Sequence, residues 1–174
     1  MGRLRRGGLT GSLILLAIAS LVLLRPGADD DSSGEAVGRA SASALVVRVI
    51  DGDTVEVSID GEREEVRYIG VDTPETVKPD APVQCFGPRA SEVNRRLVEG
   101  RRVRLVFDRE RRDVYGRLLA YVYVEEQLVS AALVGRGLAR TLTIPPNDRF
   151  AALLARLEHR AAVAGRGLWS GCRP

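Results

Sequence analysis

Carboxylates stand at two points of this sequence where β-strands are expected to begin or end. Asp53, within the run Asp51-Gly52-Asp53-Thr54, opens one expected strand, and Asp72 closes another. Carboxylate and carbonyl oxygens on strand ends and loops are the ligands that Ca²⁺ takes in proteins. The pattern predicts that Asp53 and Asp72 are direct calcium ligands, with the carbonyl of Thr73 as a third. We interpret Asp51 as an acid that stabilises the turn rather than as a ligand.

Arginines accompany these acids. Arg67 precedes Asp72 on the same expected strand, and Arg117 opens a later one. Two guanidinium groups and a cation would neutralise the charge that builds on a phosphodiester during its cleavage, while Glu75 orients or deprotonates the attacking water. The constellation predicts a phosphodiester hydrolase with Arg67, Glu75 and Arg117 as catalytic residues. The alternative is a solvated acidic patch beside two structural salt-bridge arginines.

Apolar periodicity predicts the elements that must hold these groups. Alternating or β-branched runs predict strands at 45–50, 54–59, 62–71, 103–107 and 117–124. Helices are expected at 87–98, at 129–136, and from a cap at Asn147 or Asp148 to near Gly165. Short strands with helices inserted late predict a mainly β domain with α: an OB-fold five-stranded barrel with about three helices packed on it.

The register of the second and third expected strands tests whether the carboxylates can meet. If Asp60-Gly61 is a two-residue turn, Asp53 lies opposite Tyr68, and Asp72 lies opposite Val49. A flat ladder in that register leaves the two aspartates about 13 Å apart. We therefore expect strong coiling or a bulge to bring them together.

The N-terminal part of the chain is typical of an export signal. Three arginines within residues 3–6 precede an apolar run from Leu13 to Leu24. That run is shorter than a comfortable membrane span. We expect a signal peptide or N-terminal membrane anchor at 1–25, a flexible linker at 26–44, and the folded domain at 45–174 on the outer side of the membrane.

Composition excludes several classes of site. The chain has 174 residues, a formal net charge of +3, one histidine and two cysteines, which rules out a zinc centre with two histidines or four cysteines. Cys85 and Cys172 are 87 positions apart, and in an exported chain we expect them to form a disulfide. In the chain-entropy model a loop of that length contributes about 4–5 kcal/mol. The alternative is two separate thiols.

Several blocks occur in an order that is similar to one known family. They are Asp51-Gly52-Asp53-Thr54, Arg67, Val71-Asp72-Thr73-Pro74-Glu75, Phe86-Gly87-Pro88, Asp113-Val114-Tyr115-Gly116-Arg117 and Gly167-Leu168-Trp169-Ser170. In that order the chain resembles staphylococcal-nuclease-like proteins, the thermonuclease family, over about residues 45–170. The resemblance implies an OB barrel with three helices and calcium-dependent cleavage of DNA and RNA that leaves 3′-phosphate ends.

The resemblance also assigns roles to individual residues. It implies calcium ligation by Asp53, Asp72 and Thr73, phosphate binding by Arg67 and Arg117, and the debated general-base role for Glu75. Asp113 and Tyr115 match the loop that helps hold the nucleotide.

Two departures from the family pattern stand beside these matches. The family's type member carries tyrosines after the strand that corresponds to 138–142 and lysines in the loop that corresponds to 77–83. Here the run 141–144 has no aromatic residue, and the loop has one lysine. Because stacking on an aromatic ring contributes about 1–3 kcal/mol per base, we expect weaker substrate binding or a different preference.

We therefore expect an exported, secreted or membrane-anchored nuclease that takes DNA and/or RNA. A non-catalytic OB-fold module that only binds nucleic acid is the alternative, and an exported structural domain is a third. The sequence implies no protein partner, and we expect a monomer.

Overall fold

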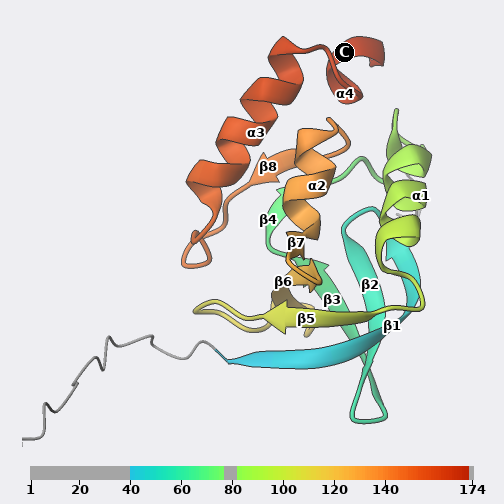
Figure 1. Ribbon diagram of the computed structural model, residues 1–174, viewed down its shortest axis with the longest axis vertical. Helices are drawn as coiled ribbons and strands as arrows, with labels where there is room; N and C mark the ends of the chain where they lie inside the picture. The colour runs from blue at the N-terminus through green and yellow to red at the C-terminus, as the bar shows by residue number, and fades with distance from the viewer. Residues whose placement is uncertain (1–39, 77–81, 173–174) are drawn as a thin grey trace, which may run out of the picture. The chain divides into compact units, whose positions relative to one another are not determined.

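A computed structural model describes residues 40–76 and 82–172 of the chain (Figure 1). The expected leader at 1–25, and the linker up to residue 39, lie outside the described residues. The described part contains no helix that is both long and apolar enough to cross a membrane. The first strand, β1 (Ser41–Asp51), begins four positions before the expected domain boundary. Residues 41–44, which were expected in the linker, therefore belong to the sheet. The reason is pairing, because these residues form a ladder with a strand that lies far along the chain.

The larger sheet is a closed five-stranded barrel extended by a two-residue strand, as the OB expectation required. Its order is β3-β2-β1-β5-β6-β7. The bounds are β2 Thr54–Ile59, β3 Glu62–Tyr68, β5 Arg102–Val106, β6 Leu118–Val124 and β7 Gln127–Leu128.

The strand β1 is long enough to serve two neighbours. Its first half pairs antiparallel with β5, with Ser41 opposite Val106, and its second half pairs with β2, with Asp51 opposite Thr54. Two register shifts interrupt the β1–β2 ladder. Bulges of this kind bend and coil a strand, which lets a small sheet curve into a barrel.

The barrel closes through a parallel pair between β3 and β6. Val66, Arg67 and Tyr68 lie opposite Leu118, Leu119 and Ala120. The two strands are separated by about 50 positions in sequence, yet closure sets the end of β3 beside the start of β6. Arg67 therefore lies in a strand that neighbours β6, and Arg117 directly precedes β6.

Helices pack against the barrel on one side in Figure 1. Their bounds are α1 Gly87–Val98, α2 Val129–Gly135, α3 Ala151–Val163 and the four-residue α4 Leu168–Gly171. The helix α1 has the predicted bounds because Pro88 suits a first turn and Gly100, at φ +74°, ends the chain's helical path. Its buried face packs on β1, and the main core joins the barrel strands to α1, α2 and Leu154 of α3.

Two expectations about local structure are wrong. The strand expected at 62–71 breaks after Tyr68, because Gly70 takes φ +86° and a short strand β4 (Gly70–Asp72) leaves the barrel to pair with β8 (Arg140–Leu142). The last helix begins at Ala151 without a side-chain cap, because the Asn147 amide binds the backbone of Glu110 instead.

Candidate active site

Asp53 lies in the tight turn between β1 and β2, and it is 5% exposed. One of its carboxylate oxygens, Oδ2, accepts hydrogen bonds from the Thr73 backbone N–H at 2.7 Å and from the Thr73 hydroxyl at 2.9 Å. The neighbouring Gly52 makes this approach feasible, because a Cβ there would lie 2.6 Å from Thr73 Oγ1. The two bonds between Asp53 and Thr73 thus join two turns that are 20 positions apart.

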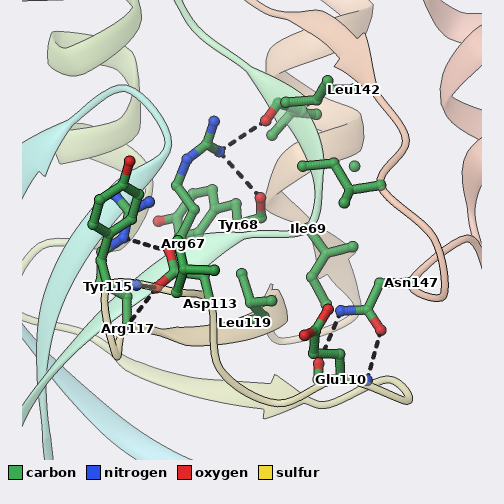
Figure 2. A pocket seen from close by; sticks show the side chains of 14 residues that line it. Arg67, Tyr68, Ile69, Glu110, Asp113, Tyr115, Arg117, Leu119, Leu142 and Asn147 are labelled. Carbon is green, nitrogen blue, oxygen red and sulfur yellow. Dashed lines mark hydrogen bonds and ion pairs between the residues drawn. The ribbon is translucent and has the colours of Figure 1, made fainter.

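Arg67 connects Asp53 with Asp72. Its guanidinium lies 3.2 Å from Asp53 Oδ2 and 3.0 Å from Asp72 Oδ1. The same group donates to the carbonyls of Tyr68 and Val71, at 3.2 and 2.8 Å, and so fills the turn between β3 and β4 (Figure 2). The break after Tyr68 therefore removes the separation expected from a flat ladder, and both aspartates face one cation.

The protonation of Asp53 reflects its burial. Desolvation raises the pKa of this carboxyl above its ordinary value. The Arg67 charge and the hydrogen bonds from Thr73 oppose that increase without cancelling it, and the nearby Asp51 adds to it. A further positive charge at this point would favour the ionised form of Asp53.

The residues that were expected to hold calcium fit a hard cation. The carboxylates of Asp53 and Asp72 converge on one guanidinium, and the Thr73 backbone is tied to Asp53. The atoms expected to bind the ion, two carboxylates and the Thr73 carbonyl, are all oxygen ligands, which suits Ca²⁺. Residues 40–76 and 82–172 hold no cluster of three or more histidine, cysteine or acidic side chains with metal-site geometry. A cation here would complete its shell with backbone oxygens, water or substrate.

Arg117 is positioned by Asp113. One Asp113 oxygen accepts the backbone N–H groups of Tyr115 and Arg117, each at 3.0 Å, and the other accepts Arg117 Nε at 2.7 Å. Gly116, at φ +84°, permits the tight turn between them. The Arg117 guanidinium lies 5.4 Å from the centroid of the Tyr115 ring, which is 81% exposed. The loop therefore presents a cation and an open aromatic face together (Figure 2).

A pocket of about 370 Å³ contains both arginines. Arg67 and Arg117 line it with Asp113 and Tyr115, and its wall is largely apolar. The wall includes Ile69, Val71, Leu119, Leu142 and Ile144. Leu142 and Ile144 come from the segment that lacks the family's aromatic residues, and both are exposed. An apolar wall beside two guanidinium groups can accommodate a flat ring next to a phosphate.

Glu75 lies two positions after Thr73 and is half-buried. Its backbone N–H donates to Gln84 Oε1 at 3.0 Å, and the Gln84 N–H donates back to the Glu75 carbonyl at 2.9 Å. Its own Oε1 accepts the N–H of Thr76 at 3.0 Å. Glu75 lines neither the arginine pocket nor a second pocket, of about 250 Å³, that includes Asp72, Thr73 and Gln84.

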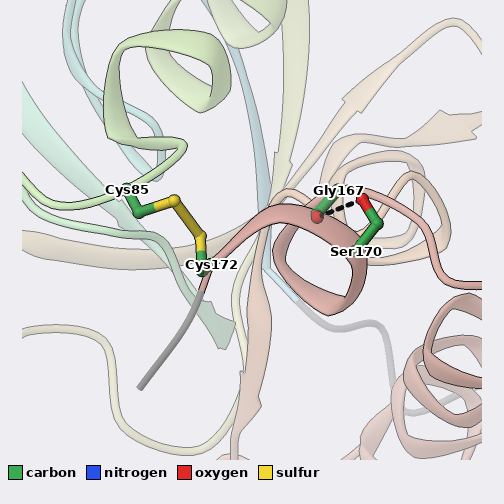
Figure 3. The surroundings of a disulfide bond; sticks show 4 residues. All are labelled: Cys85, Gly167, Ser170 and Cys172. Atoms are coloured by element: carbon green, nitrogen blue, oxygen red, sulfur yellow. Dashed lines mark hydrogen bonds between the residues drawn. A yellow bond between two sulfur atoms is a disulfide. The ribbon is translucent and has the colours of Figure 1, made fainter.

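The structure pairs Cys85 with Cys172 in a disulfide, with 5.9 Å between their Cα atoms (Figure 3). Both cysteines line the second pocket together with Asp72 and Thr73. The bridge therefore borders the acidic end of the site.

Sequence reasoning missed a buried polar network under the acidic turn. Asp51 Oδ1 accepts bonds from the Gly52 N–H, the Thr76 hydroxyl and the Ser91 hydroxyl, at 2.7, 2.7 and 2.9 Å. Asn94 donates to the Asp51 carbonyl at 3.1 Å. Asp51 stabilises its turn, as expected, but it also fastens that turn to α1. The signal was present, because Ser91 and Asn94 lie on the otherwise apolar buried face of α1.

Comparison with known proteins gives consistent matches. Residues 65–171 match the family model described as staphylococcal nuclease homologue. The chain is 42% identical over 166 residues to a thermonuclease of Staphylococcus intermedius, covering 92% of this chain and 97% of that protein. It is 36% identical over 165 residues to a thermonuclease of Staphylococcus hyicus, covering 93% and 98%. It is 44% identical over 125 residues to endonuclease YncB of Bacillus subtilis (strain 168), covering 71% and 59%.

Proposed function

Because the chain belongs to the staphylococcal nuclease homologue family, whose members include the thermonucleases that it resembles over most of its length, we propose that it is a calcium-dependent nuclease that is exported from the cytoplasm. As a member of this family it hydrolyses phosphodiester bonds in nucleic acid. The calcium requirement, the residue roles and the export are the finer parts of the proposal.

The observation that carries the proposal is the meeting of acids and arginines. Arg67 contacts Asp53 and Asp72, and Arg117 lines the same pocket as Arg67. If Arg67 and Arg117 were only structural salt-bridge partners, their guanidinium groups would not need to line the same pocket. A phosphodiester requires cations that face one cavity, because charge develops on its oxygens as the water attacks.

Each residue has a role in this proposal. Asp53, Asp72 and the Thr73 carbonyl hold Ca²⁺, which when bound polarises a phosphate oxygen as a Lewis acid. Arg67 and Arg117 bind the phosphate and counter the charge that accumulates on it. Glu75 orients the attacking water or accepts its proton.

The loop at 113–117 and the apolar wall serve to bind the nucleotide. Asp113 fixes the direction of Arg117, while the exposed ring of Tyr115 offers one stacking surface. Leu142 and Ile144 supply apolar contact where an aromatic ring would supply stacking. We therefore propose that the site binds the bases of DNA and/or RNA more weakly than an aromatic wall would.

The test is cleavage of a single-stranded oligonucleotide by the purified chain, with calcium and with a chelator. Glu75→Gln keeps the size of the side chain and removes its base, and it should lower kcat by about 10²-fold or more. Full activity in chelator would contradict the calcium role. Calcium-dependent binding without any turnover would support the non-catalytic OB module instead.

Export concerns residues 1–25, so its test is separate. After expression in a bacterial host, carbonate extraction distinguishes a released enzyme from a membrane-tethered one, and intact mass reports whether the leader has been removed. Retention of all activity in the soluble cytosol would contradict export.

A further inference from the structure

Gln84 holds Glu75 by the backbone at two points. The Gln84 side-chain oxygen accepts the Glu75 N–H, and the Glu75 carbonyl accepts the Gln84 N–H, at 3.0 and 2.9 Å. This reciprocal pair fixes the peptide groups on both sides of the Glu75 Cα. The direction in which the Glu75 carboxylate leaves the chain therefore depends on where Gln84 lies.

Besides its two bonds to Glu75, Gln84 has one further backbone contact, because its carbonyl accepts the N–H of Gly87, the first residue of α1, at 2.9 Å. Residues 82–85 are exposed and lie outside any helix or strand. The next residue along the chain, Cys85, is bonded to Cys172. The disulfide is thus the covalent restraint that is adjacent to the Gln84 contact.

The other end of the disulfide is anchored to the body of the domain. Cys172 follows α4, whose first residue, Leu168, is buried and donates its N–H to the Gly137 carbonyl at 2.9 Å. Gly167 packs so closely on Gly137 that a side chain at either position would collide with the opposing backbone. The bridge therefore ties the segment that contains Gln84 to the turn after α2.

The disulfide also lies where a change in position would matter. Cys85, Cys172 and Gln84 line the same pocket of about 250 Å³ as Asp72 and Thr73. A shift of the 82–85 segment would move Glu75 relative to these residues while leaving the barrel intact.

We propose that the Cys85–Cys172 disulfide is a positioning device for Glu75 that acts through Gln84, so that turnover depends on the oxidised bridge. The inference rests on the proposed function, because it assumes that Glu75 acts on the attacking water. It makes Gln84 a positioning residue. A misplacement of about 1 Å in a catalytic group can cost about 10²-fold in rate.

The first test measures kcat and KM of the full chain in saturating calcium, before and after reduction by tris(2-carboxyethyl)phosphine. The phosphine supplies two electrons and becomes its oxide, and the cystine becomes two thiols. We expect kcat to fall about 10-fold or more, with KM changed less than about twofold. The Cys85→Ser/Cys172→Ser double variant should match the reduced protein and should not respond to the phosphine.

The second test separates positioning from stability. Val46→Ala removes core volume from β1, a strand that contributes no residue to the pocket lined by Gln84 and the two cysteines, and should leave kcat unchanged at a temperature where every variant is folded. Gln84→Ala removes the side-chain oxygen that accepts the Glu75 N–H, and it should lower kcat. Gln84→Glu keeps an acceptor oxygen of the same reach, and it should have a kcat close to that of the original protein. In the Cys85→Ser/Cys172→Ser background, Gln84→Ala should cause little further loss, because both changes release the same contact.

The outcomes distinguish this inference from the proposed function. If the oxidised protein cleaves with calcium but the cysteine double variant and Gln84→Ala keep the original kcat, the positioning role is wrong and the nuclease stands. Fully additive losses would show that the disulfide does not act through Gln84. If the oxidised protein shows no calcium-dependent cleavage, the proposed function itself is wrong.

Discussion

Replacing Arg67 by methionine should destabilise the protein chiefly through Asp53. The Arg67 side chain is 15% exposed, and the side chains of its partners Asp53 and Asp72 are 7% and 59% exposed. Breaking a buried ion pair from one side costs about 3–5 kcal/mol, because the remaining charge has no counter-ion. The exposed Asp72 contact adds about 0–1 kcal/mol, and the lost bond to the Val71 carbonyl about 1 kcal/mol.

Protonation of Asp53 limits the loss of stability in this variant. The pKa of Asp53 is already raised by burial, and without Arg67 it rises further, so the carboxyl can become neutral instead of remaining as an unpaired charge. We therefore expect Arg67→Met to lower the free energy of unfolding by about 3–4 kcal/mol at neutral pH. The difference from the original protein should shrink as the pH falls through the Asp53 pKa of the variant and then through that of the original protein.

The assay is urea unfolding followed by the fluorescence of Trp169, the single tryptophan of the chain. A change in midpoint with an unchanged slope isolates stability. Asp72→Asn is the matched control, because it removes the exposed partner of the same guanidinium and should cost only about 0–1 kcal/mol. If Arg67→Met and Asp72→Asn had equal and small effects, the reasoning that Asp53 burial dominates would be refuted.

Three further predictions concern other parts of the site and the barrel. Arg117→Ala should lower kcat by about 10²-fold in the oligonucleotide assay with little change in melting temperature, since the Arg117 side chain is 30% exposed; an unaltered rate would remove Arg117 from the mechanism. Gly52→Ala should cost about 1–3 kcal/mol in urea unfolding, because the new Cβ would displace Thr73, and a neutral result would mean that the turn can relax. The bond from Arg112 lowers the pKa of Glu64 below its ordinary 4.5, so the pair contributes stability above that pH and loses it as the pH falls through the lowered value. NMR titration should show the Glu64 pKa returning toward 4.5 in Arg112→Ala, and an unchanged titration would contradict the assignment.

Short-range patterns were sufficient for the parts of the fold that form from neighbouring residues. Asp60-Gly61 turns in two residues, so Ile59 lies opposite Glu62 and Asp53 bonds to Tyr68 across the ladder, as the turn chemistry predicts. The helix at 87–98 has its predicted bounds because its start and stop residues are local. The candidate carboxylates and arginines lie at the ends of expected strands, so they too could be identified from neighbouring residues.

Tertiary contacts decided how those groups meet. The parallel pair of β3 with β6 brings Arg67 beside the start of β6, which Arg117 directly precedes, and nothing within either strand specifies that partner. The exit of β4 toward β8 folds Thr73 onto Asp53, and it depends on an edge supplied about 70 positions later. Ordering residues far apart in sequence costs chain entropy that only the packed core repays. The residue types that can perform hydrolysis are therefore determined by the sequence. The contact of Arg67 with both aspartates, the shared pocket of Arg67 and Arg117, and the Gln84 contact that holds Glu75 are decided by the tertiary structure.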